Sequence, residues 1–302
     1  MIRALLPPAA GLAASPFLFA VINRTKAFFA GRRGPPLLQP YFDLWKLLRK
    51  GATYSRTTTW VFRAGPVVGL ASAAAALLLL PWGSLPALVV FPGDFVLFAT
   101  LLCLARFFTV LAALDTGSSF EGMGASREVL FSALAEPALF LGLAAVAAQT
   151  KAVSLSDMLG GVSVSSWAAE GPALALVCAA LFAVLLAENA RIPVDDPNTH
   201  LELTMIHEVM VLDHSGPDLA FLQVGAAVKL WLFGGLLVGL AVPVRTGDAF
   251  LDAGAFLAGM LALAVLVGVV ESCMARLRLA RVPVLLLGAI ALTVVALVLV
   301  MR

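Results

Sequence analysis

Residues 282–301 form an uninterrupted apolar run, VPVLLLGAIALTVVALVLVM, which contains no charged side chain. A bilayer core about 30 Å thick is crossed by about 20 apolar residues in a helix, so this run predicts a transmembrane helix. The composition agrees, because 61% of the 302 residues are hydrophobic, 13% are charged and the mean hydropathy is +1.00. Soluble domains carry about 25% charged residues. These values exclude a soluble globular enzyme, a disordered tail and a nucleic-acid-binding protein.

Seven more segments are long and apolar enough to cross a bilayer. They are residues 4–23, 64–82, 93–114, 129–149, 172–189, 221–243 and 249–270. The connections between them reach at most about 40 residues, which is too few to bury a hydrophobic core of their own. The sequence therefore predicts an all-α integral membrane protein with eight transmembrane helices, which form one polytopic membrane domain over residues 1–302.

The basic residues predict the orientation of these spans. Of the 20 Lys and Arg residues, 14 lie in the first, third, fifth and seventh connections and four on the opposite side, while Arg106 and Lys229 lie within spans. Basic residues concentrate in loops that stay in the cytoplasm. Both termini are therefore expected on the non-cytoplasmic side. The first span is expected to remain as a helix rather than to be cleaved as a signal peptide, because the dense positive charge follows it.

The first cytoplasmic connection contains an amphipathic segment. Over Leu37–Lys50, a helix would place Gln39, Asp43 and Lys46 on one face and leucine and aromatic side chains on the other. Such a helix either lies in the membrane interface or forms a surface on which another subunit docks, and both interpretations stay open. The docking candidates in this connection are Arg32, Arg33, Gln39, Asp43 and Lys46.

The third cytoplasmic connection is acidic and holds all three histidines of the chain, His200, His207 and His214. An Asp-Pro pair at 196–197 is a typical helix start and Ser-Gly-Pro at 215–217 a typical stop, so a helix is expected over residues 197–214. Histidines seven residues apart lie about 10 Å apart along a helix, too far to share one ion. No metal site is therefore expected in this chain, and His200 and His207 become docking candidates.

Ionisable side chains inside the spans indicate either structural pairing or function. Arg106 and Lys229 lie deep in the third and sixth spans, and Glu136 lies in the fourth. Each such group costs about 3 kcal/mol to insert and usually faces a partner or a water-filled cavity. The alternative to ion pairing is a hydrated proton path that runs from Glu136 through Glu188 into the acidic connection. The candidates along it include Glu202, Glu208 and Asp213.

Two long motifs resemble the first-subunit family of respiratory complex I. Residues 34–40 (GPPLLQP), followed by Asp43 and residues 46–48 (KLL), resemble that family's first cytoplasmic loop. Residues 187–195 (AENARIPVD) resemble its signature at the end of the fifth span, and the resemblance continues to residues 212–216 (LDHSG). Residues 197–208 (PNTHLELTMIHE) are similar to the membrane anchor of formate hydrogenlyase, hydrogenase-4 and related energy-converting nickel–iron (NiFe) hydrogenases.

The resemblance implies a multi-pass subunit of a bacterial or archaeal cytoplasmic membrane, which docks a peripheral redox arm and links electron transfer to proton translocation. It implies a NiFe-hydrogenase-like large subunit, an iron–sulfur subunit and antiporter-like membrane subunits as partners. The NiFe centre and the iron–sulfur clusters would lie in those partners, and no cofactor is expected in this chain. The resemblance also matches Glu136 to the acidic residue of the family's fourth span. It places five side chains in a charged funnel between arm and membrane: Glu188, Arg191, Asp195, Glu202 and Asp213.

Two other functions stay open at this point. A subunit that forms the quinone site of complex I is disfavoured, because residues 32–36 (RRGPP) and Asp213-His214 depart from the complex I pattern at that site. A stand-alone ion transporter is disfavoured because the sequence shows no inverted repeat and no pair of broken helices. The chain also contains no phosphate-binding loop, nucleophile elbow or catalytic dyad, so we expect it to be a non-catalytic subunit of an oxidoreductase complex.

Overall fold

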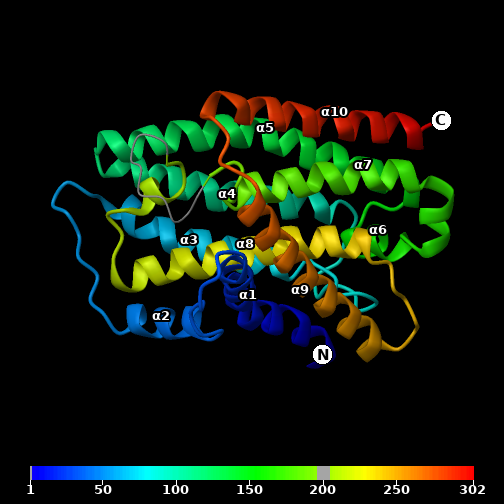
Figure 1. The fold of residues 1–302 in the computed structure, drawn as a ribbon, viewed down its shortest axis with the longest axis horizontal. Coiled ribbons are helices and arrows are strands. Elements are labelled where there is room, and N and C mark those ends of the chain that lie inside the picture. Colours follow the sequence, from blue (N-terminus) through cyan, green and yellow to red (C-terminus); the bar gives the residue numbers. More distant parts are fainter. Residues whose placement is uncertain (1, 196–204) are drawn as a thin grey trace.

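The computed structural model describes residues 2–195 and 205–302, with side chains from residue 7 onward. Within these ranges the regular secondary structure is helical, without strands (Figure 1). The α-helices are α1 (Ile2–Phe29), α2 (Gln39–Leu48), α3 (Trp60–Leu77), α4 (Asp94–Asp115), α5 (Ser119–Thr150), α6 (Leu155–Gly161), α7 (Val164–Glu188), α8 (Gly216–Ala241), α9 (Ala249–Cys273) and α10 (Val282–Val300). Two short 3-10 helices are η1 (Glu208–Val211) and η2 (Leu279–Arg281).

Among the described residues, seven helices are long and apolar enough to cross a membrane: α3, α4, α5, α7, α8, α9 and α10 with η2. They coincide with seven of the predicted spans, so the protein is a multi-pass membrane protein. The remaining predicted span, residues 4–23, lies within α1. Helix α5 begins ten residues before the predicted span 129–149, because its first turns are polar but buried against η1, as Glu121 and Gly124 show.

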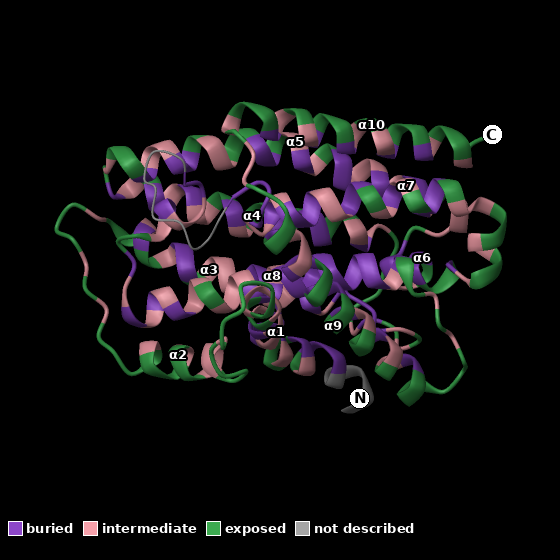
Figure 2. Cartoon of the chain, in the orientation of Figure 1, coloured by how far each residue is buried: buried purple, intermediate pink, exposed green. Residues whose placement is uncertain are grey.

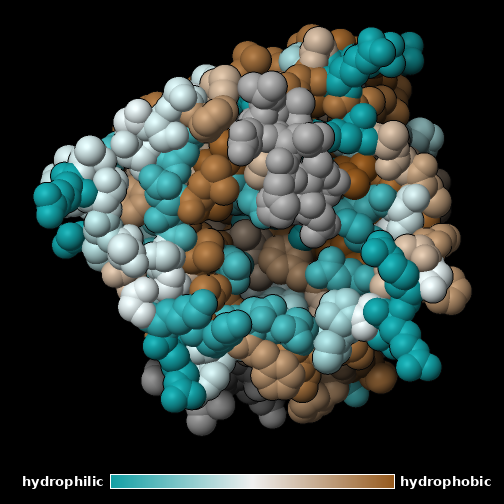
Figure 3. All heavy atoms as spheres, turned by 60° about the vertical axis from the view of Figure 1, so that its left-hand side comes forward, coloured by the Kyte–Doolittle hydropathy of each residue, from teal (hydrophilic) through white to brown (hydrophobic). Residues whose placement is uncertain are grey.

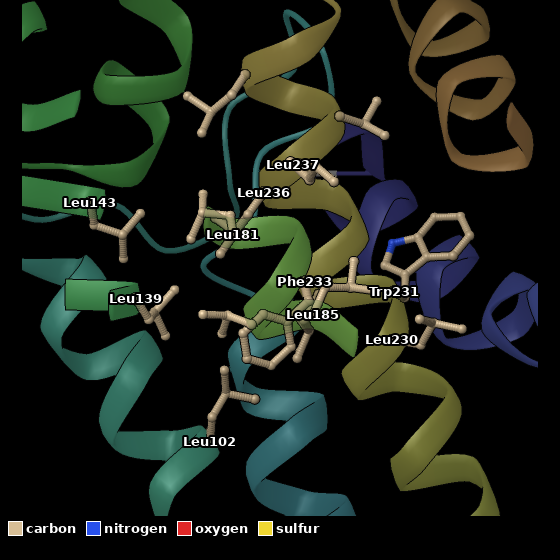
Figure 4. Packing of buried hydrophobic residues seen from close by; sticks show 14 of the residues in the cluster. Leu102, Leu139, Leu143, Leu181, Leu185, Leu230, Trp231, Phe233, Leu236 and Leu237 are labelled. Carbon is tan, nitrogen blue, oxygen red and sulfur yellow. The ribbon is translucent and has the colours of Figure 1, made fainter. Parts of the chain in front are cut away.

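Helix α8 lies at the centre of the bundle and contacts α1, α3, α7 and α9. Its central segment is 67% buried, against 28–50% for the other candidate spans, and it is mostly purple in Figure 2. Figure 4 shows Phe233 and Leu236 of α8 beside Leu181 and Leu185 of α7, with leucines of α4 and α5 around them. Packing of this kind, rather than the removal of apolar surface from water, holds helices together inside a bilayer.

The amphipathic helix predicted in the first connection is confirmed as α2 (Gln39–Leu48). Pro40 occupies its first turn, where a missing N–H costs nothing. The helix packs against α1 and α8, and the Tyr41 hydroxyl donates to the Ala13 carbonyl at 2.6 Å. The opposite side is open, with Phe42 57% and Trp45 64% exposed. One apolar side of α2 therefore rests on the bundle, and the other is left for lipid or a partner.

The helix predicted over residues 197–214 is wrong over residues 205–214, which are the part of it that the structure describes. Only η1 is helical there, and it is a single 3-10 turn. Asp195 accepts hydrogen bonds from the backbone N–H groups of Ile206 at 3.1 Å and His207 at 3.3 Å, which fixes a turn instead of a helix. Gly124 of α5 permits the close approach, because a Cβ there would lie 2.8 Å from the Ile206 carbonyl oxygen. These tertiary contacts override the local helix signals.

The two long connections meet each other beside the start of α8. Thr53 donates its N–H to the Ser215 hydroxyl at 2.9 Å. Gly216 has a φ of +57°, and a Cβ at this position would lie 2.6 Å from the Gly51 carbonyl oxygen, so only glycine fits without strain. We call this end of the bundle, at the left of Figure 1, the loop end.

Candidate functional site

Arg106 of α4 lies inside the bundle among carboxylates from two other helices. Its Nη2 donates to both carboxylate oxygens of Glu188 at 2.9 and 2.8 Å, and its Nη1 donates to Glu136. Its Nε lies 3.6 Å from an oxygen of Glu128. Lys229 of α8 places its Nζ 2.8 Å from Glu188. We call these five side chains, drawn from α4, α5, α7 and α8, the Arg106 cluster.

The Arg106 cluster is buried on one side and reaches the surface of the bundle on the other. The side chain of Glu188 is 4% exposed and that of Arg106 is 8% exposed, whereas Glu136 is 34% exposed. Three carboxylates face two cations, so the cluster carries a net charge of about −1 if every group is ionised. Burial of an uncompensated charge is expensive, which favours the binding of one proton by the cluster.

A cavity of about 80 Å³ borders the Arg106 cluster. Arg106, Glu128, Glu188 and Lys229 line its polar side together with His207, and apolar residues of α1, α3, α4 and α8 form the remaining walls. Because a buried water molecule needs about 10–15 Å³, several could occupy it. A smaller void of about 10 Å³ lies between Glu128, Glu188 and Asp195. The space around the cluster therefore extends toward the loop end, where hydrophilic side chains gather in Figure 3.

A second charged group holds the segment after α7 against the end of α9. Asp195 pairs with Arg276 at 2.7 Å, and Leu277 donates its N–H to the Pro193 carbonyl at 2.8 Å. Glu271 pairs with Arg191 at 3.3 Å and with Lys26 of α1 at 2.8 Å. The predicted site residues Arg191 and Asp195 are thus held by Glu271 of α9 and by Arg276, which follows α9. Asp195 also borders the small void beside the Arg106 cluster.

The structure places other candidates away from the cluster or elsewhere than expected. His207, a docking candidate, is half-buried and lines the cavity. Burial, with a smaller effect of the nearby Lys229 charge, lowers the pKa of His207 to about 4, so it is neutral near pH 7. Glu208 is half-buried in η1, and Asp213 is exposed, its N–H donating to Glu121 at 3.3 Å. Glu202 and His200 lie outside the described residues.

The docking candidates of the first connection lie on or beside α2. Arg32, Arg33, Asp43 and Lys46 are exposed, and the half-buried Gln39 donates to Asp43 at 2.9 Å. These residues are accessible to a partner, and the interpretation that a subunit docks on them stays a prediction.

Glu128 and Glu121 are site residues that the sequence patterns did not predict. Glu128 precedes the predicted fourth span by one residue, so the sequence patterns did not count it among the ionisable side chains inside the spans. The spacing of Glu121, Glu128 and Glu136, seven and eight residues, places all three on one face of a helix and is the signal that could have revealed them.

Comparisons with known proteins show the family of this chain. The family described as NADH dehydrogenase matches residues 4–301 of this chain.

The chain belongs to the NADH dehydrogenase family.

Among the similar members of the NADH dehydrogenase family are two proteins of Escherichia coli K12. Formate hydrogenlyase subunit 4 is 33% identical over 90% of this chain and 89% of its own length. Hydrogenase-4 component C is 30% identical over 76% of this chain and 71% of its own length. An NADH-quinone oxidoreductase subunit of Rubrobacter xylanophilus is 31% identical over 64% of this chain and 57% of its own length.

Among solved structures, the fold matches a chain of the membrane-bound sulfane sulfur reductase, an archaeal respiratory membrane complex, with a TM-score of 0.84. The match covers 99% of this chain and 98% of that chain at 20% identity, which shows that the fold is shared. The resemblance to the complex I subunit 1 family, and within it to the membrane anchors of formate hydrogenlyase and hydrogenase-4, is confirmed.

A buried histidine at the loop end makes the stability of the protein depend on pH. The His214 ring stacks on Phe62 with centroids 3.9 Å apart, and burial lowers the pKa of His214 to about 4. As pH falls from about 6.5 to about 4, the unfolded chain binds a proton that the folded chain does not, at a cost on the order of 3 kcal/mol. Burial likewise lowers the pKa of His207.

We therefore expect His214→Phe to retain the stacking and to reduce the loss of stability on acidification, because position 214 then no longer binds a proton in the unfolded chain alone. Thermal unfolding in detergent at about pH 7.5 and about pH 5 measures this, with His214→Asn as a variant that lacks the aromatic stacking. An unchanged pH dependence in His214→Phe would mean that this ring titrates normally.

Proposed function

We propose that this chain is the membrane anchor and proton-coupling subunit of a respiratory complex of the hydrogenase-4 or formate hydrogenlyase type. The Arg106 cluster is the observation that supports this most directly, because three intramembrane carboxylates around two cations form a site that can gain and release one proton. The names of the two Escherichia coli relatives support a hydrogenase-type complex.

The proton would enter from the loop end and leave at the side of the bundle. The route begins near Asp195, passes the small void to Glu128 and Glu188, and reaches Glu136, which is one-third exposed on α5. Water in the cavity and the void would connect the carboxylates, since the groups themselves need not touch. Charge changes in a docked redox arm would act on Asp195 and His207 first and would alter the proton affinity of the Arg106 cluster through them.

The partners follow from this function. A NiFe-hydrogenase-like large subunit and an iron–sulfur subunit would carry the NiFe centre and the clusters and would dock at the loop end, on the exposed Arg32, Arg33 and Lys46. Antiporter-like membrane subunits would receive the protons. The chain would be one polytopic domain of a bacterial or archaeal cytoplasmic membrane, with α1 as an eighth span and both termini on the non-cytoplasmic side.

A quinone-site-forming subunit of complex I is the second candidate. The apolar walls of the cavity and the similarity to an NADH-quinone oxidoreductase subunit favour it. A quinone-site inhibitor that labels this chain in its native complex would support this alternative.

The proposed orientation is tested with thiols at opposite ends of the bundle. Met301 follows α10 and is 75% exposed, and the exposed Cys273 ends α9 on the proposed cytoplasmic side. In spheroplasts that express Met301→Cys, a membrane-impermeant maleimide is expected to label position 301 and to spare Cys273. Inverted vesicles should give the reverse pattern. Labelling of Cys273 but not of position 301 in spheroplasts would contradict a C-terminus on the non-cytoplasmic side, and labelling of both positions from one side would contradict α10 as a span.

The coupling role is tested by neutral substitutions in the Arg106 cluster. Glu188→Gln and Glu136→Gln each leave two carboxylates facing two cations, so proton translocation per electron pair is expected to fall by about tenfold or more while the complex still assembles. Vesicle acidification measured together with hydrogen turnover gives this ratio, and co-purification reports assembly. The control is Asp157→Asn, an exposed carboxylate of α6, which lies at the right of Figure 1, opposite the loop end. Wild-type proton translocation in both variants would refute the role.

A further inference from the structure

The two cations of the Arg106 cluster are held in different ways. Arg106 binds both oxygens of Glu188 through Nη2, and its Nη1 binds Glu136. Its Nε lies 3.6 Å from Glu128. Lys229 makes a single ion pair among the described residues, with Glu188 at 2.8 Å. A lysine ammonium is a point charge on a flexible four-carbon stem, whereas a guanidinium in a bidentate contact is fixed in direction. Lys229 is therefore the cation that can move.

The cavity of about 80 Å³ provides the room for this movement. A side chain in an α-helix leans toward the helix N-terminus and covers the turn that precedes it. This geometry directs the side chain of Lys229 over Gly225 and Ala226, which both line the cavity. Because neither residue has a side chain that extends beyond Cβ, the space next to the lysine stem is open rather than packed. The side chain of Lys229 is accordingly 17% exposed.

A second carboxylate borders the same cavity. Glu128 of α5 lines it together with Glu188 and His207, and both glutamates also line the small void of about 10 Å³. Among the described residues, the titratable and charged groups around the ammonium are thus these two carboxylates, Arg106 and a histidine that is neutral near pH 7. Glu128 is the alternative partner, because Arg106 approaches it through Nε at 3.6 Å, without a hydrogen bond.

We propose that Lys229 is a positioning residue that controls proton binding in the Arg106 cluster, and that its ammonium alternates between Glu188 and Glu128 through the cavity. A carboxylate that loses a neighbouring cation binds a proton more readily. With the ammonium on Glu128, a proton from water at the loop end binds an oxygen of Glu188. When the ammonium returns to Glu188, that proton passes to Glu136 and then to the surface. Lys229 keeps its own proton throughout.

This inference rests on the proposed function and adds the group that regulates it. His207, in the acidic connection, lines the cavity, and its backbone N–H donates to Asp195 at 3.3 Å. A shift of this turn by a docked subunit would change the space beside the ammonium. Movement of Lys229 would thereby link the docked subunit to the proton without the displacement of a transmembrane helix.

The movement is tested by Lys229→Arg in the intact, membrane-embedded complex. Arginine keeps the positive charge, but its bidentate contact holds it on one carboxylate. We expect proton translocation per electron pair to fall several-fold in the assembled complex, measured by vesicle acidification together with hydrogen turnover. A lysine that only balanced charge would be replaced by arginine without loss. The matched control is Lys151→Arg, an exposed lysine that follows α5, which should keep the wild-type ratio.

A second variant obstructs the path of the ammonium and leaves every charge in place. Ala226→Leu fills part of the cavity next to Lys229 and should lower the same ratio several-fold, whereas Ala241→Leu, at the exposed end of α8, should not. A wild-type ratio in either assembled variant would overturn the proposal, and Ala226→Leu decides alone if Lys229→Arg does not assemble. This outcome is distinguishable from failure of the proposed function, in which Glu188→Gln also keeps the wild-type ratio.

Discussion

The burial of Arg106 among Glu128, Glu136 and Glu188 is the interaction on which the rest of the structure depends. A guanidinium cannot be left unpaired in the middle of a bundle, because breaking a buried ion pair costs about 3–5 kcal/mol. Its three partners come from α5 and α7, and Lys229 on α8 shares one of them. The cluster therefore joins four helices. It contains three carboxylates and two cations, so one carboxylate has no cation to balance its charge.

Ion pairs and backbone hydrogen bonds connect the loop end to the cavity beside this cluster. Glu271 of α9 binds Lys26, at the end of α1, and Arg191, at the start of the acidic connection, so one buried carboxylate ties the two long connections together. Asp195, held by Arg276, accepts the backbone N–H of His207, and His207 lines the cavity beside Glu188. If a docked subunit displaced residues at the loop end, we expect the ion pairs of Glu271 and Asp195 to shift and to move the backbone at His207, which lines the cavity.

The sequence predicted those features that the bilayer imposes locally. A span must be apolar for about 20 residues, so α4, α8 and α10 were visible as runs, and Arg106 and Lys229 stood out inside them. Features that depend on packing were not predictable in this way. The first turns of α5 are polar because they face η1. Over residues 205–214, the described part of the expected helix 197–214, a turn forms instead because Asp195 and Gly124 provide a better arrangement. Which carboxylates meet Arg106 likewise depends on how α5 and α7 pack.

The central claim is that the Arg106 cluster holds one exchangeable proton. Infrared difference spectroscopy of the intact complex, recorded between its oxidised and reduced states, observes this proton directly through the C=O stretch of a protonated carboxyl group. A carboxylic-acid band should appear or shift on reduction, should move on exchange into heavy water, and should be lost in Glu188→Gln while persisting in Asp157→Asn. A difference spectrum without a carboxylic-acid band, or one that is identical in Glu188→Gln, would contradict the claim.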